Sequence, residues 1–367
     1  MVQNMEKIKK NLLPVIIGTV FGFAAGVLLF SMDDGKRSDI LLLEFFIAFF
    51  VGSIIQTILH ELGHMIAGLI SGYEFSSFRI FQFTWIRENG KVKFKKFSLK
   101  GTAGQCLMIP PKDRGLEYPI IFYNIGGVLM NFISSVLFLI FGFTLKNEVF
   151  VFMCIPGFYL ALTNGIPLQI NGIANDGKNI VDIRKSKTAK KAMDTLLRCN
   201  ALQMHGIRLK DMPQEWFVAE EPCDLRNIHV CTLIYLDLCR ESDKGNYVEY
   251  EKKVKEFLGK ETALLEIYRC ELKCELIFVY IKQRRYDEAE KLYMEMEQYL
   301  NRTKMFLEHY PLMYGYQKLV KQNQGNAEKL LTEYEKMKKT YPYKSAIVIG
   351  DEDIKNIDSG LYQSEKR

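Results

Sequence analysis

The sequence predicts an α-helical polytopic membrane protein, with four transmembrane helices and a small membrane-proximal β-hairpin, followed by an all-α soluble domain of helical hairpins. Nearly all long apolar runs in the 367 residues lie before residue 170. After about residue 186, charged residues dominate and follow helical amphipathic patterns. Between the second and third apolar runs, alternating residues flank an Asn-Gly pair, which is typical of a β-hairpin. We therefore expect a transmembrane domain at residues 1–185 and a cytoplasmic α-helical domain at residues 186–367.

Four segments are long and apolar enough to cross a bilayer, whose hydrocarbon core needs about 20 helical residues. They cover about residues 12–31, 40–70, 119–145 and 149–168. The first is not followed by the small-residue cleavage site of a signal peptide, so we expect it to be a retained anchor. The second contains Glu44 and a pair of histidines, which are unusual inside a membrane span.

Loop charges orient these spans, because cytoplasmic loops carry an excess of Lys and Arg. Residues 73–117 contain nine Lys or Arg and four Asp or Glu, and the segment after the fourth span is also basic. Both termini are therefore predicted to be cytoplasmic, in a multi-pass protein of the plasma membrane. The formal net charge is only +6. We expect the lipid bilayer, and no nucleic acid, among the partners.

The second span contains the pattern His60-Glu61-Leu62-Gly63-His64. Residues i and i+4 of a helix lie one above the other, so the two imidazoles can bind one metal ion. Glu61 adjoins the first ligand and can act as general base toward a water that the metal activates. A chance pattern at a helix end is the alternative. It is disfavoured because the chain has only five histidines, and because ionisable groups within a span are usually functional.

Two histidines leave a catalytic zinc site one protein ligand short. Glu74 is close in sequence, but it follows Gly72 in an expected turn. Asp176 is the better candidate, because it follows the fourth span at the same membrane level and Pro167 ends the helix before it. An ordinary Asn-Asp-Gly turn is the alternative interpretation of Asp176. The expected cofactor is Zn²⁺, held by the two histidines and Asp176.

These residues resemble the site-2 protease family of intramembrane zinc metalloproteases. That family has a His-Glu-x-x-His motif in one span and a Gly-Pro-x-x-Asn-like motif in the next. A later span ends in Asn-x-x-Pro and is followed by an Asp-Gly pair whose Asp is the third zinc ligand. The corresponding segments here are His60–His64, Gly126–Asn131, Asn164–Pro167 and Asp176–Gly177. Val128 stands where Pro is common and Asn175 where Leu is usual.

The resemblance implies a membrane-embedded endopeptidase that hydrolyses peptide bonds of membrane-associated peptide or protein substrates near the cytoplasmic side of the bilayer. It also implies that Asn131 contacts the substrate backbone or the oxyanion, with an interhelical hydrogen bond as the alternative. Asn164 is a second candidate for such a contact. The basic, aromatic hairpin at about residues 78–98 has a counterpart in the family. It could bind an extended substrate by β-addition, or lie at the membrane surface as an anchor.

The soluble region contains six amphipathic patterns, at residues 188–199, 225–239, 247–257, 262–282, 286–300 and 327–339. Its Tyr280–Tyr293 segment resembles the turn and second helix of a tetratricopeptide-type hairpin, so residues 186–367 are expected to bind a protein partner. A catalytically silent membrane scaffold that presents this domain is the rival function. A metal carrier is a third interpretation. Intact ligands and an intact Glu61 argue against the scaffold, and Glu61, which a carrier would not need, argues against the carrier.

Overall fold

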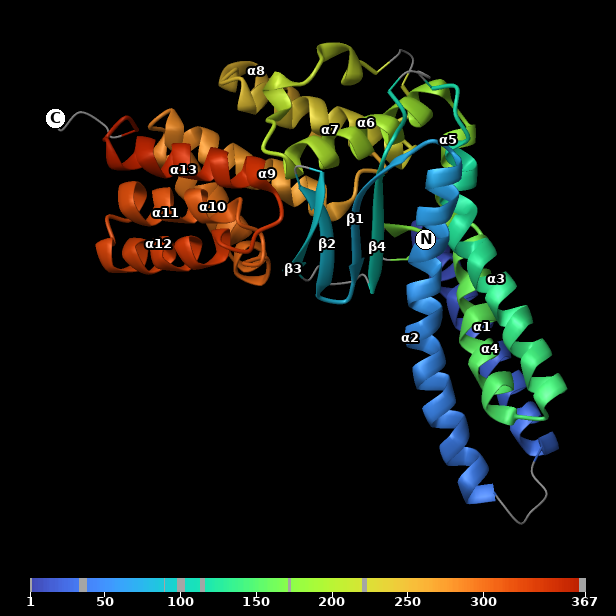
Figure 1. Cartoon of the computed structure of the whole chain (residues 1–367). Coiled ribbons are helices and arrows are strands. Elements are labelled where there is room, and N and C mark those ends of the chain that lie inside the picture. Colours follow the sequence, from blue (N-terminus) through green and yellow to red (C-terminus); the bar gives the residue numbers. More distant parts are fainter. Residues whose placement is uncertain are drawn as a thin grey trace. The chain divides into compact units, whose positions relative to one another are not determined.

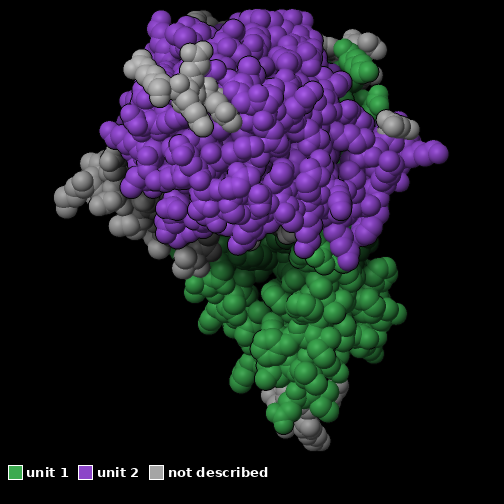
Figure 2. All heavy atoms as spheres, turned by 90° about the vertical axis from the view of Figure 1, so that its left-hand side faces the viewer, with its two compact units in different colours: residues 1–85, 100–185 green, residues 86–99, 186–367 purple. Residues whose placement is uncertain are grey.

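The structure, a computed structural model, describes residues 2–32, 38–88, 90–97, 103–112, 116–170, 173–219 and 223–362. The chain forms two compact units, coloured green and purple in Figure 2. The first unit contains residues 1–85 and 100–185, and the second contains residues 86–99 and 186–367. The division therefore differs from the expected one in the segment 86–99, which belongs to the helical unit.

Four long helices run side by side in the first unit (Figure 1): α1 (Val2–Met32), α2 (Ser38–Ile70), α3 (Ile120–Leu145) and α4 (Glu148–Gly165). Three stretches in them are long and apolar enough to cross a membrane: Asp39–Ile70, Ile120–Leu145 and Glu148–Gly165. The expected first span lies within α1, where the apolar stretch Ile16–Ser31 is shorter. The mostly helical architecture is thus confirmed, and three helices among the described residues are long and apolar enough to cross a membrane.

Glycines allow α2 and α3 to approach closely. A side chain on Gly63 would collide with the carbonyl of Gly126, and one on Gly126 would collide with the carbonyl of Gly63. The two backbones are therefore in direct contact one residue before His64. Small residues favour such packing between membrane helices, where no hydrophobic effect drives association. This contact brings the helix that contains His60 and His64 against α3.

The expected hairpin is part of a four-stranded antiparallel sheet of order β3-β2-β1-β4. Its strands are β1 (Glu74–Ile80), β2 (Phe83–Glu88), β3 (Lys91–Lys96) and β4 (Gly104–Ile109). In the β1–β4 pair, Phe78 lies opposite Cys106 and Ile80 lies opposite Gly104. Of the expected Asn-Gly turn, Gly90 has a positive φ of 76°, and Asn89 lies outside the described residues.

The alternating residues before the Asn-Gly pair contain an additional turn. The chain turns at Phe81 and Gln82, so the pattern is divided between β1 and β2. Phe81 has a φ of 52°, in the left-handed region that non-glycine residues rarely adopt. Its backbone N–H donates to the Ala103 carbonyl (2.7 Å), and its own carbonyl accepts from Arg79 (3.0 Å). One contact from Arg79 within β1 and one from Ala103 outside it therefore maintain a turn that the alternation did not indicate.

The second unit contains the expected helices and others that the patterns did not predict. The expected ones are α6 (Lys187–Met204), α7 (Ile228–Asp243), α8 (Tyr247–Leu258), α9 (Glu266–Lys282), α10 (Tyr286–Arg302) and α12 (Gln324–Lys338). The others include α11 (His309–Gly315) and α13 (Lys344–Asp358). Helices α9 and α10 pack against each other across a shared apolar core.

The segment 86–99 is attached to the helices of its own unit by two kinds of contact. Phe97 packs edge-on against Tyr341, with ring centroids 5.7 Å apart. The buried carboxylate of Glu88 is paired with Lys93 (3.0 Å), Lys95 (2.8 Å) and Lys344 (3.4 Å). These contacts explain why the far end of the sheet belongs to the helical unit.

Candidate metal centre

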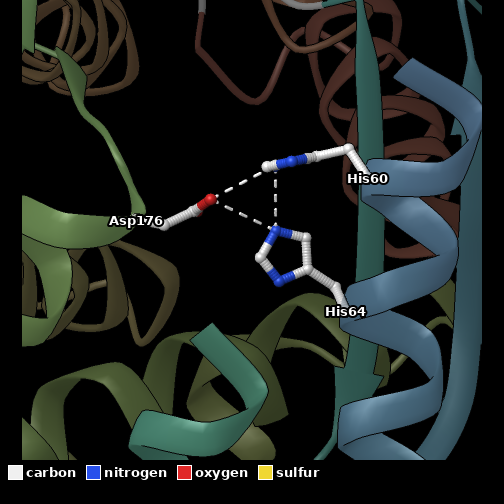
Figure 3. A group of neighbouring side chains, drawn as sticks. All are labelled: His60, His64 and Asp176. Atoms are coloured by element: carbon white, nitrogen blue, oxygen red, sulfur yellow. Dashed lines mark hydrogen bonds and ion pairs between the residues drawn. The ribbon is translucent and has the colours of Figure 1, made fainter. Parts of the chain in front are cut away.

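Three side chains converge where the α2 histidines face the start of α5 (Asp176–Arg184) (Figure 3). The Nε2 atoms of His60 and His64 are 3.2 Å apart. The Oδ2 atom of Asp176 lies 3.2 Å from the first and 3.4 Å from the second. All three side chains are largely buried, with exposed fractions of 12%, 11% and 17%. This group could hold a metal ion.

The outer nitrogens of both imidazoles are held by acceptors. The Nδ1 of His64 donates to the Tyr123 carbonyl (2.9 Å), since a carbonyl can only accept. The Nδ1 of His60 lies 2.6 Å from the Oδ1 of Asn131. The amide nitrogen of Asn131 donates to the Gln56 carbonyl (2.7 Å), so the oxygen of that amide must face His60. In its neutral form, each imidazole therefore carries its proton on Nδ1 and directs the Nε2 lone pair at the site.

Two nitrogen lone pairs and a carboxylate oxygen at 3.2–3.4 Å require a positive charge between them. The spacing fits a zinc ion, because ligand bonds of about 2.0–2.1 Å at tetrahedral angles place neighbouring ligand atoms about 3.3 Å apart. The Oδ2 atom of Asp176 is shielded from solvent, and it lies 3.2 and 3.4 Å from the two imidazole Nε2 atoms. The residues present therefore fit a metal ion of this size.

Gly127 on α3 leaves open the space beside the ligand nitrogens. A Cβ atom there would lie 2.6 Å from the His64 Nε2 and 2.7 Å from the His60 Nε2, well inside ordinary contact. Any residue other than glycine would therefore fill the volume that an ion, or a fourth ligand to it, requires. The glycine pair 126–127 has two roles: the first residue packs against α2, and the second leaves space at the site.

Asn175 orients Asp176, although the sequence did not identify this role. As the N-cap of α5, its Oδ1 accepts from the backbone N–H groups of Lys178 (2.9 Å) and Leu168 (3.0 Å). Its Nδ2 donates to the carbonyls of Thr163 and Ile166, at the end of α4. The turn between α4 and α5 is therefore fixed on both sides, and the carboxylate next to Asn175 is directed at the histidines.

The carboxylate of Glu61 faces the first residue of β4. A Cβ atom on Gly104 would collide with the Glu61 side chain, which is 8% exposed. The edge of the sheet therefore covers the expected general base. Cys106 follows two residues later, and its burial, together with the charge on Glu61, raises the pKa of its thiol well above its usual range. Cys106 is not a member of the metal-ligand group among the described residues.

The other expected site residues lie around this group. Asn131 is fully buried behind His60, and both ends of its amide are hydrogen-bonded. Asn164 lies in the last turn of α4 and donates to the Leu160 carbonyl (3.1 Å). Substrate contacts by either asparagine stay predictions. Glu74 begins β1 and is not a member of the metal-ligand group among the described residues.

Several supporting residues had only weak signals in the sequence. The Asn-Asp-Gly tripeptide indicates a helix cap at Asn175, and Gln56 belongs to a polar stripe in an otherwise apolar span. Nothing in the sequence indicated that the Tyr123 carbonyl would face His64, because a backbone acceptor has no residue-type signature. Comparisons with known proteins add nothing here: no family model, curated protein or solved structure matches this chain.

Proposed function

We propose that this chain is an intramembrane zinc metalloprotease of the type that its motifs resemble, the site-2 protease family. The observation that carries the proposal is the convergence of the His60 and His64 Nε2 atoms and the Asp176 Oδ2 atom, 3.2–3.4 Å apart. Glu61 adjoins this group on the same helix. A scaffold or a metal carrier would need no carboxylate at that position.

His60, His64 and Asp176 would hold the ion. A zinc ion bound there supplies a Lewis acid that polarises the scissile carbonyl and makes water a better nucleophile at neutral pH. Glu61 accepts the proton of the attacking water and then donates it to the leaving amine, which breaks the peptide bond and restores the carboxylate. The Asn131 and Tyr123 oxygens keep both imidazole protons on Nδ1 throughout.

The membrane setting completes the proposal. We propose that α1 is a fourth span, so that both termini lie in the cytoplasm of a multi-pass plasma-membrane protein and the site faces the cytoplasmic side. The basic character of residues 73–117 supports this orientation. The substrates are then membrane-associated peptides or proteins whose cleaved segment reaches that side of the bilayer.

For the helical unit we propose tetratricopeptide-like packing and a role in binding a protein partner. The α9–α10 pair supports this, because it forms an antiparallel hairpin over a shared apolar core. A repeat of this kind buries its apolar face against neighbouring helices and leaves another surface for a partner.

The experiment compares Glu61→Gln with Glu74→Gln, in which the same chemical change is made outside the metal-ligand group. Each variant is expressed in cells that lack the parent, and newly formed peptide termini of membrane proteins are measured by mass spectrometry. Loss of a general base typically costs about 10²–10⁴ in rate. We therefore expect Glu61→Gln to accumulate uncleaved substrate while it still inserts and binds zinc, and Glu74→Gln to behave like the parent.

Metal content is measured on the same purified proteins. The parent should contain about one zinc per chain, His60→Ala and His64→Ala should lose it, and Asp176→Ala should bind it more weakly. Suppose that Glu61→Gln restores every function of the parent in cells, whereas the variant that lacks residues 186–367 restores none. The protease proposal would then be wrong, and the membrane scaffold would be the better interpretation.

A further inference from the structure

A buried hydrogen-bond network extends from His60 through Asn131 to Gln56, one turn earlier on α2. Gln56 has no exposed surface. The Asn131 Nδ2 donates to both oxygens of Gln56, the backbone carbonyl at 2.7 Å and the side-chain Oε1 at 2.9 Å. Gln56 therefore provides two acceptors for the Asn131 Nδ2, and these two hydrogen bonds fix the orientation of the Asn131 amide.

The Gln56 side chain is itself held from two further sides. Its Oε1 also accepts from the Ser134 hydroxyl (2.9 Å), and its Nε2 donates to the Ser135 hydroxyl (3.4 Å). On α4, Gly157 leaves room for the amide, because a Cβ atom there would collide with Gln56 and with Ser135. Three helices thus fix one glutamine amide in one orientation.

The orientation of the Asn131 amide matters because its two ends have opposite hydrogen-bonding character. With oxygen toward His60, the neutral imidazole donates from Nδ1 and presents a bare Nε2 at the site. With nitrogen toward His60, the imidazole must accept at Nδ1, and its proton moves to Nε2, where it blocks metal binding.

We infer that Gln56 is a positioning residue that acts through Asn131 to keep the proton of His60 on Nδ1 and its Nε2 free for the metal ion. The inference rests on the proposed function for its purpose, whereas the proton position can be measured without any metal. The alternative is a purely structural hydrogen bond between helices, with no effect on the imidazole.

The first measurement is the proton position of His60 in the zinc-free, full-length protein at pH 8. Nitrogen NMR of histidine-labelled protein separates imidazoles protonated at Nδ1 from those protonated at Nε2, and His60→Ala assigns the signal. The parent should show His60 protonated at Nδ1. Gln56→Met removes the Oε1 acceptor of Asn131 but leaves the backbone carbonyl that also accepts from it. It should therefore show a detectable fraction of the Nε2-protonated form beside the Nδ1-protonated one. Thr57→Val is the matched control, because among the described residues the Thr57 hydroxyl bonds to the Ser53 carbonyl, within α2 and outside this network.

Two further variants act on the same network in different ways. Gly157→Ala pushes the Gln56 amide from the α4 side without removing any polar group, so it should reproduce the mixture of His60 forms. Gln56→Glu in its protonated form keeps an acceptor for Asn131, so it should resemble the parent. If Gln56→Met fails to insert, these two variants still test the inference.

The second measurement is zinc affinity by chelator competition. Asn131→Ala removes a direct partner of a ligand and should weaken binding about 10–100-fold. Gln56→Met should weaken it measurably, but by no more than Asn131→Ala. The double variant should bind zinc as Asn131→Ala does, because Gln56 acts only through Asn131.

The outcomes separate this inference from the proposed function. If the parent binds no zinc, the metalloprotease is refuted. If its His60 is nevertheless protonated at Nδ1, and part of that form is replaced by the Nε2-protonated form in Gln56→Met, the positioning role is supported. An unchanged His60 in both Gln56→Met and Gly157→Ala would overturn the positioning role. Additive losses of zinc affinity in the double variant would do so as well.

Discussion

Gly127→Ala tests the geometry of the candidate metal centre with one methyl group. The new Cβ would lie 2.6 Å from the His60 Cε1 and from the His64 Nε2, where ordinary contact begins at 3.4 Å. The imidazoles would therefore have to move by about 0.7–0.8 Å, whereas a metal site tolerates about 0.2 Å in its ligand distances. Moving α3 away instead would separate Gly126 from Gly63, where the two backbones touch.

Because two ligands are displaced at once, zinc affinity should fall by more than the 10–100-fold typical of losing one outer partner. Helix stability cannot account for such a loss, since alanine favours a helix by about 1 kcal/mol over glycine. The assay is chelator competition on purified protein, together with cleavage in cells. Gly22→Ala on α1 is the matched control, because its Cβ meets nothing within 4 Å. A Gly127→Ala protein that bound zinc like the parent would refute the arrangement of ligands described above.

Three further predictions concern other parts of the chain. Asn175→Ala should weaken zinc binding about 10–100-fold, because Asp176 loses the cap that orients it; Asn323→Ala, which removes the cap of α12, controls for general loss of a helix cap and should leave zinc affinity unchanged. Reporter fusions after residues 10, 100 and 200 should be cytoplasmic and one near residue 36 external; a cytoplasmic result at residue 36 would contradict the four-span topology. Burial alone would raise the pKa of Glu88, but hydrogen bonds from Lys95 and Lys93 lower it to about 2 from its usual 4.5. Because the folded-state pKa is lowered, the stabilisation is present at neutral pH and is lost as the pH falls from about 4.5 toward 2. Hydrogen exchange in residues 90–97, corrected for the intrinsic rate, should rise over that range in the parent, and the same exchange should already be fast at pH 7 in Glu88→Gln. Equal protection in parent and variant at pH 7 would show that Glu88 does not hold this segment.

The sequence alone was sufficient where the relevant physics is local. The 3.6-residue period of a helix puts His60 and His64 on one face in any fold that keeps that helix, and the structure has them there. The length of an apolar run identifies a helix able to cross a membrane, and three such runs are found as helices. Amphipathic periodicity likewise predicted six helices of the second unit.

Tertiary structure decided whatever depends on segments that are far apart in the chain. Asp176 lies more than a hundred residues after His64, and its oxygen reaches the histidines because Asn175 fixes the turn that follows α4. The break at Phe81 and the attachment of residues 86–99 to the helical unit depend on partners elsewhere in the chain, such as Ala103 and Tyr341. Residue type and spacing do not predict which distant residues will become such partners. The approach of helix backbones at glycines, and the carbonyls and amides that happen to face each other across that contact, determine how the site is assembled.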